Sequence, residues 1–124
     1  MFVRQRPKAV AAQAEALDDL LDHAAIYLRE KRKEGAGVLS TAVFEDTIRR
    51  IVRSTGEDPT GKTLDPLINA LVQSDTITGI VAKRCRAAAG VRNSALHANW
   101  EEFTLDDVGA VVTLTRELLS QHMA

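Results

Sequence analysis

Apolar side chains recur along this chain at the three- and four-residue spacing of an α-helix, and no segment shows a convincing strand pattern. The first stripe lies in a helix predicted from about Lys8 to Glu34, which Gly35 and Gly37 are expected to close. Its members are Leu17, Leu20, Leu21, Ala24 and Leu28. This periodicity predicts an all-α protein.

Further helices are predicted from the same spacing and from capping signals. A second helix has the apolar stripe Phe44, Ile48, Ile51 and Val52, and the last has Val108, Val111, Val112, Thr115, Leu118 and Leu119. The predicted spans are about Leu39–Thr55, a short helix from Asp65-Pro66, about Asp75–His97, and a helix that opens at the capping-box-like Thr104-Leu-Asp-Asp107. Because short loops make consecutive helices neighbours, we expect a bundle of about five helices with a long antiparallel first pair.

Length and composition fit one domain over residues 1–124, since 124 residues with 45% hydrophobic side chains can bury a core. The net charge of −1 gives no overall electrostatic signature of nucleic-acid binding. No apolar run approaches the roughly 20 residues that span a bilayer, and Met1–Lys8 lacks the apolar core of a signal peptide. We therefore expect a cytoplasmic protein with no membrane contact. The single cysteine, Cys85, is interpreted as a small core residue.

One stretch, Gly56-Glu-Asp-Pro-Thr-Gly-Lys-Thr63, matches the phosphate-binding loop pattern GxxxxGK[ST]. That loop works when a buried strand precedes it and a helix opens directly after it. Here the preceding residues form an amphipathic, arginine-rich helical pattern. We interpret the match as a helix connection, and Lys62→Ala with an ATP-binding assay tests the alternative of a nucleotide hydrolase.

The most informative polar residues are Arg92, Asn93 and His97, near the end of the fourth predicted helix. Asn93 and His97 share a helix face, and the long Arg92 side chain can swing toward them. An imidazole can move a proton, a guanidinium can hold a phosphate, and an amide can orient either group. This set suffices for metal-independent RNA cleavage, with no cofactor and no metal ion. One copy offers one such histidine, so a symmetric dimer would supply the second.

A structural interpretation of the same residues stays open. Arg and His near a helix C-terminus also complement the helix dipole and cap its carbonyls. Trp100 and Phe103, which follow the motif, are able to stack on a base, but an aromatic pair in this position more often closes a core or a dimer contact.

The motif resembles the signature of the HEPN superfamily: an Arg, a short spacer whose first residue is often polar, and a His. The resemblance extends over Ala42–Arg50, Gly61–Ile68 and Val91–Val108, which are similar to stretches of small prokaryotic HEPN-like proteins. It implies a helical bundle that dimerises with its two motifs facing each other. It also implies, for many members, metal-independent endoribonuclease activity in toxin-antitoxin, antiviral defence or RNA-processing systems, with Arg92 and His97 catalytic and Asn93 supporting.

The resemblance has one departure and leaves one alternative. Toxins paired with a nucleotidyltransferase-type antitoxin often carry a tyrosine two residues after the histidine, where this chain has Asn99. The superfamily also contains members without demonstrated nuclease activity. The alternative function is therefore a noncatalytic dimerisation or nucleotide/RNA-binding module that works with a partner protein.

Basic residues near the motif are candidate RNA contacts: Lys83, Arg84 and Arg86 on its own helix, and Arg49, Arg50 and Arg53 on the second. Such arginines also decorate solvent-facing helices and pair with acidic residues four positions away, as Glu45 is expected to do with Arg49. The resemblance implies a second possibility for Glu45, because acidic residues on the second helix of some relatives face the motif: Glu45 would then hold Arg92 or His97 in place.

Overall fold

The computed structural model describes residues 8–123, and in that range it contains five α-helices, a short 3₁₀ helix and no strand. The prediction of an all-α protein is confirmed for these residues. The N-terminal segment expected to lack a signal peptide lies almost wholly outside the described residues. The helices are α1 (Lys8–Arg29), α2 (Lys33–Ser54), α3 (Leu64–Gln73), α4 (Gly79–Leu96), the 3₁₀ helix η1 (Trp100–Glu102) and α5 (Leu105–His122).

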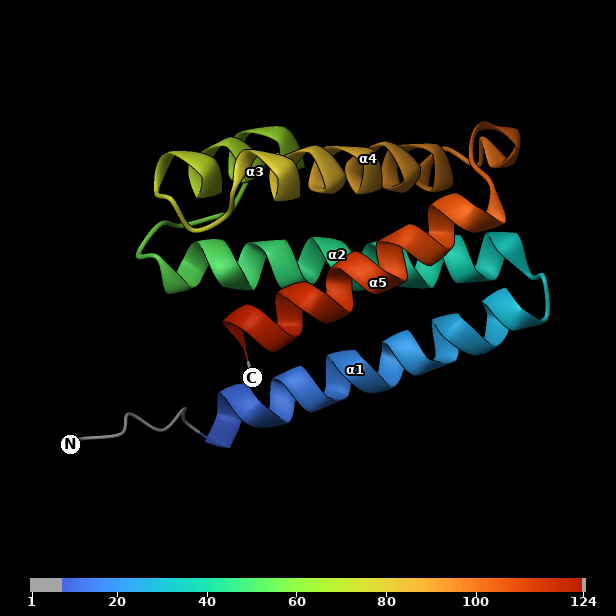
Figure 1. Cartoon of the computed structure of the whole chain (residues 1–124), viewed down its shortest axis with the longest axis horizontal. Helices are drawn as coiled ribbons and strands as arrows, with labels where there is room; N and C mark the ends of the chain where they lie inside the picture. The colour runs from blue at the N-terminus through green and yellow to red at the C-terminus, as the bar shows by residue number, and fades with distance from the viewer. Residues whose placement is uncertain (1–7, 124) are drawn as a thin grey trace.

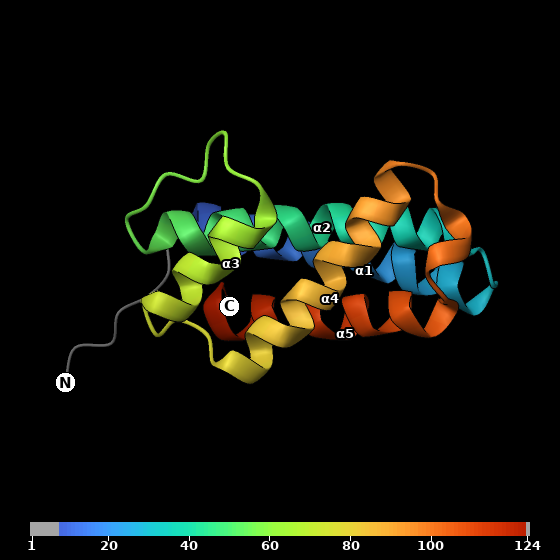
Figure 2. The same ribbon diagram turned by 90° about the horizontal axis from the view of Figure 1, so that it is seen from above.

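Helix α2 lies at the centre of the bundle, where α1, α3, α4 and α5 all contact it. Figure 1 shows α1 and α2 as a long antiparallel pair, with α5 packed across them. Seen from above, α4 crosses over α2 at an angle, and the loop between α2 and α3 projects beyond the bundle (Figure 2). In the range 8–123, no helix combines the length and the hydropathy needed to cross a membrane.

The core follows the predicted stripes. Phe44, Ile48, Ile51 and Val52 of α2 are at most 1% exposed, and the apolar stripe of α5 is buried along its length. Leu20 is an exception on α1, since 41% of it is exposed. This burial explains why the amphipathic helices assemble into one bundle. Each helix can remove its apolar face from water only by packing that face against another helix.

The single cysteine is a core residue, as predicted. Cys85 is fully buried in the main hydrophobic cluster. Burial raises the pKa of its thiol to about 11, although Arg84 and Arg86 favour the thiolate. A thiol in this state is a poor nucleophile.

The boundary between the first two helices was predicted wrongly. Helix α1 ends at Arg29 because Lys31 adopts a left-handed conformation with φ 59°, and the Arg32 amide donates to the Tyr27 carbonyl at 2.8 Å. Gly35 and Gly37, expected to close the first helix, instead lie in the first turns of α2. At Gly37 a Cβ atom would lie 2.9 Å from Cε2 of Phe103, so the glycine lets this ring approach the helix.

Two other helix starts also differ from prediction. Helix α3 has Thr63 as its N-cap residue, so Asp65 and Pro66 lie inside its first turn. Helix α4 begins at Gly79 because Asp75 (φ 57°) still belongs to the turn that ends α3, and the Thr78 hydroxyl accepts from the Val81 amide at 3.3 Å.

The capping box at the start of α5 is confirmed. The Asp107 amide donates to Thr104 Oγ1 at 3.1 Å, and Asp107 Oδ2 accepts from the Thr104 amide at 2.9 Å. Just before it, the buried Phe103 ring meets Trp100 edge to face, with ring centroids 6.3 Å apart. This aromatic pair closes the core at the end of the bundle where the Arg-Asn-His motif lies.

Candidate functional site

The Arg-Asn-His motif lies at the C-terminal end of α4. Arg92 and Asn93 belong to the helix, and His97 is its C-cap residue. Ala98 then takes a left-handed conformation with φ 57°, and the Asn99 amide donates to the Ser94 carbonyl at 2.8 Å. This Schellman-type ending turns the chain sharply after His97, so the helix that carries the motif ends at this residue.

Arg92 is held by Glu45 of α2. Its Nε lies 2.7 Å from Glu45 Oε1, and the two side chains are 31% and 21% exposed. Arg92 Nη1 also donates to Asn93 Oδ1, at 3.3 Å. The carboxylate thus fixes the direction of the guanidinium, while solvent access keeps the pair partly screened.

Glu45 serves two arginines at once. Its second oxygen, Oε2, lies 3.3 Å from Nε of Arg49, one turn further along α2. The predicted pair with Arg49 is therefore present, and so is the alternative contact with Arg92. The four-residue spacing on α2 predicts the pair with Arg49. The pair with Arg92 has no such local signal, because only the packing of α4 on α2 brings Arg92 to Glu45.

His97 is exposed, and its imidazole makes no hydrogen bond or ion pair with any residue of the described chain. Arg92 and His97 are five positions apart, which separates them by about 140° around an ideal helix, whereas Asn93 and His97 differ by about 40°. The structure therefore brings Arg92 and Asn93 into contact, directs Arg92 toward α2, and leaves Asn93 and His97 at the surface.

A groove of about 480 Å³ runs beside Arg92 between α2 and α4. Its charged centre is Glu45, Asp46, Arg49 and Arg92, and its rim is apolar. Val38 is 50% exposed and Leu96 is 62% exposed. This apolar rim was not predicted from the sequence. The available signal was that Val38 falls outside the stripe to which Phe44 belongs, so it points away from the core.

The other candidate RNA contacts on α4 do not gather around the motif. Arg84 Nη1 binds Glu117 Oε2 of α5 at 2.6 Å, and Arg86 Nη2 donates to Asn69 Oδ1 of α3 at 2.8 Å. Lys83 is exposed. The hydrogen bond between Arg84 and Glu117 lowers the pKa of the carboxyl and raises that of the guanidinium. Arg84 and Arg86 therefore bind side chains of two different helices, α5 and α3.

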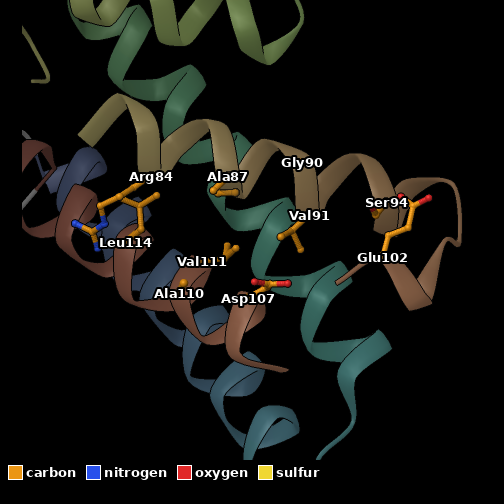
Figure 3. Close-up of a pocket in the computed structure, with 11 residues that line it drawn as sticks. Arg84, Ala87, Gly90, Val91, Ser94, Glu102, Asp107, Ala110, Val111 and Leu114 are labelled. Atoms are coloured by element: carbon orange, nitrogen blue, oxygen red, sulfur yellow. Dashed lines mark hydrogen bonds between the residues drawn. The ribbon is translucent and has the colours of Figure 1, made fainter. Parts of the chain in front are cut away.

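A second groove, of about 410 Å³, lies between α4 and α5 (Figure 3). Ala87, Gly90 and Ala110 leave it open because their side chains are small, and Arg84 stands at one end. At the other end Ser94 Oγ donates to Glu102 Oε2 at 2.9 Å. The polar groups at both ends of this groove already have partners within the chain.

The stretch Gly56–Thr63 follows α2, and no strand precedes it in the described part of the chain. Gly56 and Gly61 take left-handed conformations with φ 95° and 76°. Arg49 donates from Nη1 to the Pro59 carbonyl at 2.9 Å and from Nη2 to the Lys62 carbonyl at 2.8 Å. The strand-loop-helix context that a phosphate-binding loop requires is thus not formed in residues 8–123.

Comparisons of this chain with protein-family models, with curated proteins and with solved structures found no match. Residues 8–123 contain no cluster of three or more His, Cys, Asp or Glu side chains that could hold a metal ion. The function must therefore be argued from the side chains around Arg92 and His97.

Proposed function

We propose that this protein is a metal-independent endoribonuclease of the HEPN type that acts as a homodimer with a composite Arg/His site. The observation that carries the proposal is the state of the two residues: Arg92 is oriented by Glu45 at 2.7 Å, and the His97 imidazole, close by in the chain, is exposed with no partner among the described residues. Phosphodiester cleavage needs an oriented cation and a proton-transfer group at the same phosphate, and the dimer proposed below is what would bring these two groups together.

The reaction is a transphosphorylation. His97 removes the proton from a ribose 2′-hydroxyl, the 2′-oxygen forms a bond to phosphorus, and the bond from phosphorus to the 5′-oxygen breaks. A second acid protonates the leaving 5′-oxygen. Arg92 stabilises the charge that builds on the non-bridging oxygens through its free N–H groups, since Nη2 makes no hydrogen bond within the described residues. The products carry a 2′,3′-cyclic phosphate and a 5′-hydroxyl.

A second copy supplies the second proton-transfer group. The exposed apolar side chains Val38 and Leu96 flank the groove beside Arg92, where a dimer contact would cover them. A symmetric contact on this face brings two motifs together, with His97 of one copy as base and His97 of the other as acid. Asn93, bonded to Arg92, then keeps the guanidinium turned toward the shared phosphate.

The biological setting that we propose is cytoplasmic, as a toxin or an antiviral effector restrained by an antitoxin or another protein partner. Toxicity on expression is the corresponding cellular expectation. Arg92→Ala and His97→Ala should each relieve it.

Cleavage of labelled total RNA and tRNA in EDTA tests the proposal. Wild type should cut, and His97→Ala should lose cutting while it keeps the helical spectrum and the dimer mass of wild type. His23→Ala is the matched control because His23 is also exposed but lies on α1, and it should cut normally. Equal cutting by the wild type and His97→Ala would refute the assignment.

A noncatalytic binding module is the second candidate, and one observation favours it. Glu45 already neutralises Arg92, which weakens the attraction of this arginine for a phosphate. This candidate predicts a folded dimer that binds RNA or a nucleotide, does not cleave it, and loses binding when Arg92 is replaced by Ala.

A further inference from the structure

The loop of residues 55–63, between α2 and α3, extends beyond the bundle (Figure 2), and the Arg49 side chain of α2 binds two of its carbonyls. Arg49 donates from its two terminal nitrogens to the carbonyls of Pro59 and Lys62, at 2.9 and 2.8 Å. Gly56 and Gly61 in the same loop adopt left-handed conformations that other residues adopt at a cost.

The same guanidinium also reaches the candidate site. Nε of Arg49 lies 3.3 Å from Glu45 Oε2, and Glu45 Oε1 lies 2.7 Å from Nε of Arg92. Both oxygens of one carboxylate are therefore occupied, which restricts its rotation. Two hydrogen bonds join the loop carbonyls to Arg49, a third joins Arg49 to Glu45, and an ion pair joins Glu45 to Arg92.

We infer that Arg49 is a positioning residue through which the conformation of loop 55–63 sets the orientation of the Arg92 guanidinium. A planar guanidinium presents its N–H groups in fixed directions, so moving the loop carbonyls rotates Arg49 and changes how it holds Glu45. Lysine carries one charged nitrogen and cannot reproduce the three contacts at once. The consequence for catalysis rests on the proposed function, whereas the coupling from loop to Arg92 can be measured without it.

The direct measurement is hydrogen exchange of the Arg92 Nε–H in the full-length ¹⁵N-labelled protein, with the signal assigned by its loss in Arg92→Lys. The test variants are Arg49→Lys, which removes the two terminal nitrogens that bind the loop carbonyls, and Gly61→Ala, which acts on the loop alone. A Cβ at Gly61 meets no atom within 4 Å, so this substitution perturbs only the backbone conformation.

Arg50→Lys is the matched control. Arg50 is the neighbouring α2 arginine, but it pairs with Asp46 at 2.8 Å and Gln13 at 2.7 Å. We expect exchange of the Arg92 Nε–H to quicken by about fivefold in Arg49→Lys and Gly61→Ala, the effect of weakening one partly exposed ion pair. In Arg50→Lys the exchange should stay at the wild-type rate.

Two results overturn the inference: unchanged exchange in both folded test variants, or equal acceleration in Arg50→Lys. If Arg49→Lys fails to fold, Gly61→Ala decides alone, because it leaves every side-chain contact of Arg49 chemically possible. RNA cleavage separates the two proposals. If exchange accelerates in the variants but the wild type cuts no RNA, the coupling is supported and the nuclease is rejected. If cutting depends on His97 but exchange is unchanged in the variants, the nuclease is supported and the coupling is rejected.

Discussion

Gly37 offers a quantitative test of how the bundle is packed beside the motif. It lies in the first turns of α2, where a Cβ atom would stand 2.9 Å from Cε2 and 3.0 Å from Cζ of Phe103. The ring cannot withdraw easily, since Phe103 is only 2% exposed. Gly90 is the matched position: it is helical too, but a Cβ there meets no atom within 4 Å.

The two Gly→Ala substitutions should therefore have opposite effects on the free energy of unfolding. Alanine improves helix propensity by about 1 kcal/mol at either position. At Gly37 the overlap with Phe103 costs about 1–3 kcal/mol, as overpacking does in other cores. The net result is a loss of about 1 kcal/mol for Gly37→Ala and a gain of about 1 kcal/mol for Gly90→Ala.

Urea and thermal unfolding followed by circular dichroism measure this difference. A gap of about 2 kcal/mol corresponds to about 8 °C in Tm for a domain of this size. Phe103→Leu should cost less in the Gly37→Ala background than in wild type, because the clash is then removed. The reasoning is refuted if Gly37→Ala is as stable as Gly90→Ala, or if the Phe103→Leu effect is the same in both backgrounds.

Three further predictions follow from the local structure. Ala98→Gly should raise the free energy of unfolding by about 0.5–1 kcal/mol, since glycine adopts the left-handed conformation without strain; equal or lower stability in urea would count against the Schellman ending. The lowered pKa of Glu117 means that its pairing with Arg84 stabilises the fold fully above the ordinary glutamate pKa and is lost as the pH falls through the lowered value. The stability difference between wild type and Glu117→Gln should thus shrink in acid, and a difference independent of pH would contradict this. The Cys85 thiol, with its pKa raised to about 11, should react with a disulfide reagent at pH 8 only as fast as the protein unfolds, whereas reaction at the rate of an exposed thiol would show that it is accessible.

Helix number and the buried faces were predictable because they depend on local periodicity. The stripes of α2 and α5, and the capping box at Thr104, are encoded within a few consecutive residues. Helix ends were less predictable. Lys31, Asp75 and Ala98 take left-handed conformations that glycine favours, while Gly35 and Gly37 continue a helix. Tertiary packing, here the Phe103 ring on Gly37, overrides the local preference.

The candidate site was only partly predictable for the same reason. The spacing of Arg92, Asn93 and His97 indicates that they lie on one helix, and Arg92 does contact Asn93. The pairing of Arg92 with Glu45 depends on how α4 crosses α2, and the attachment of loop 55–63 by Arg49 depends on where that loop folds back. Neither contact leaves a signal in the spacing along one chain.

The chemical identity of the RNA ends tests the central claim most directly. Product fragments made by the purified protein in EDTA should carry 2′,3′-cyclic phosphate and 5′-hydroxyl termini, and they should be absent with His97→Ala. Fragments with 3′-hydroxyl and 5′-phosphate termini, or cyclic-phosphate fragments that persist in His97→Ala, would contradict cleavage by Arg92 and His97.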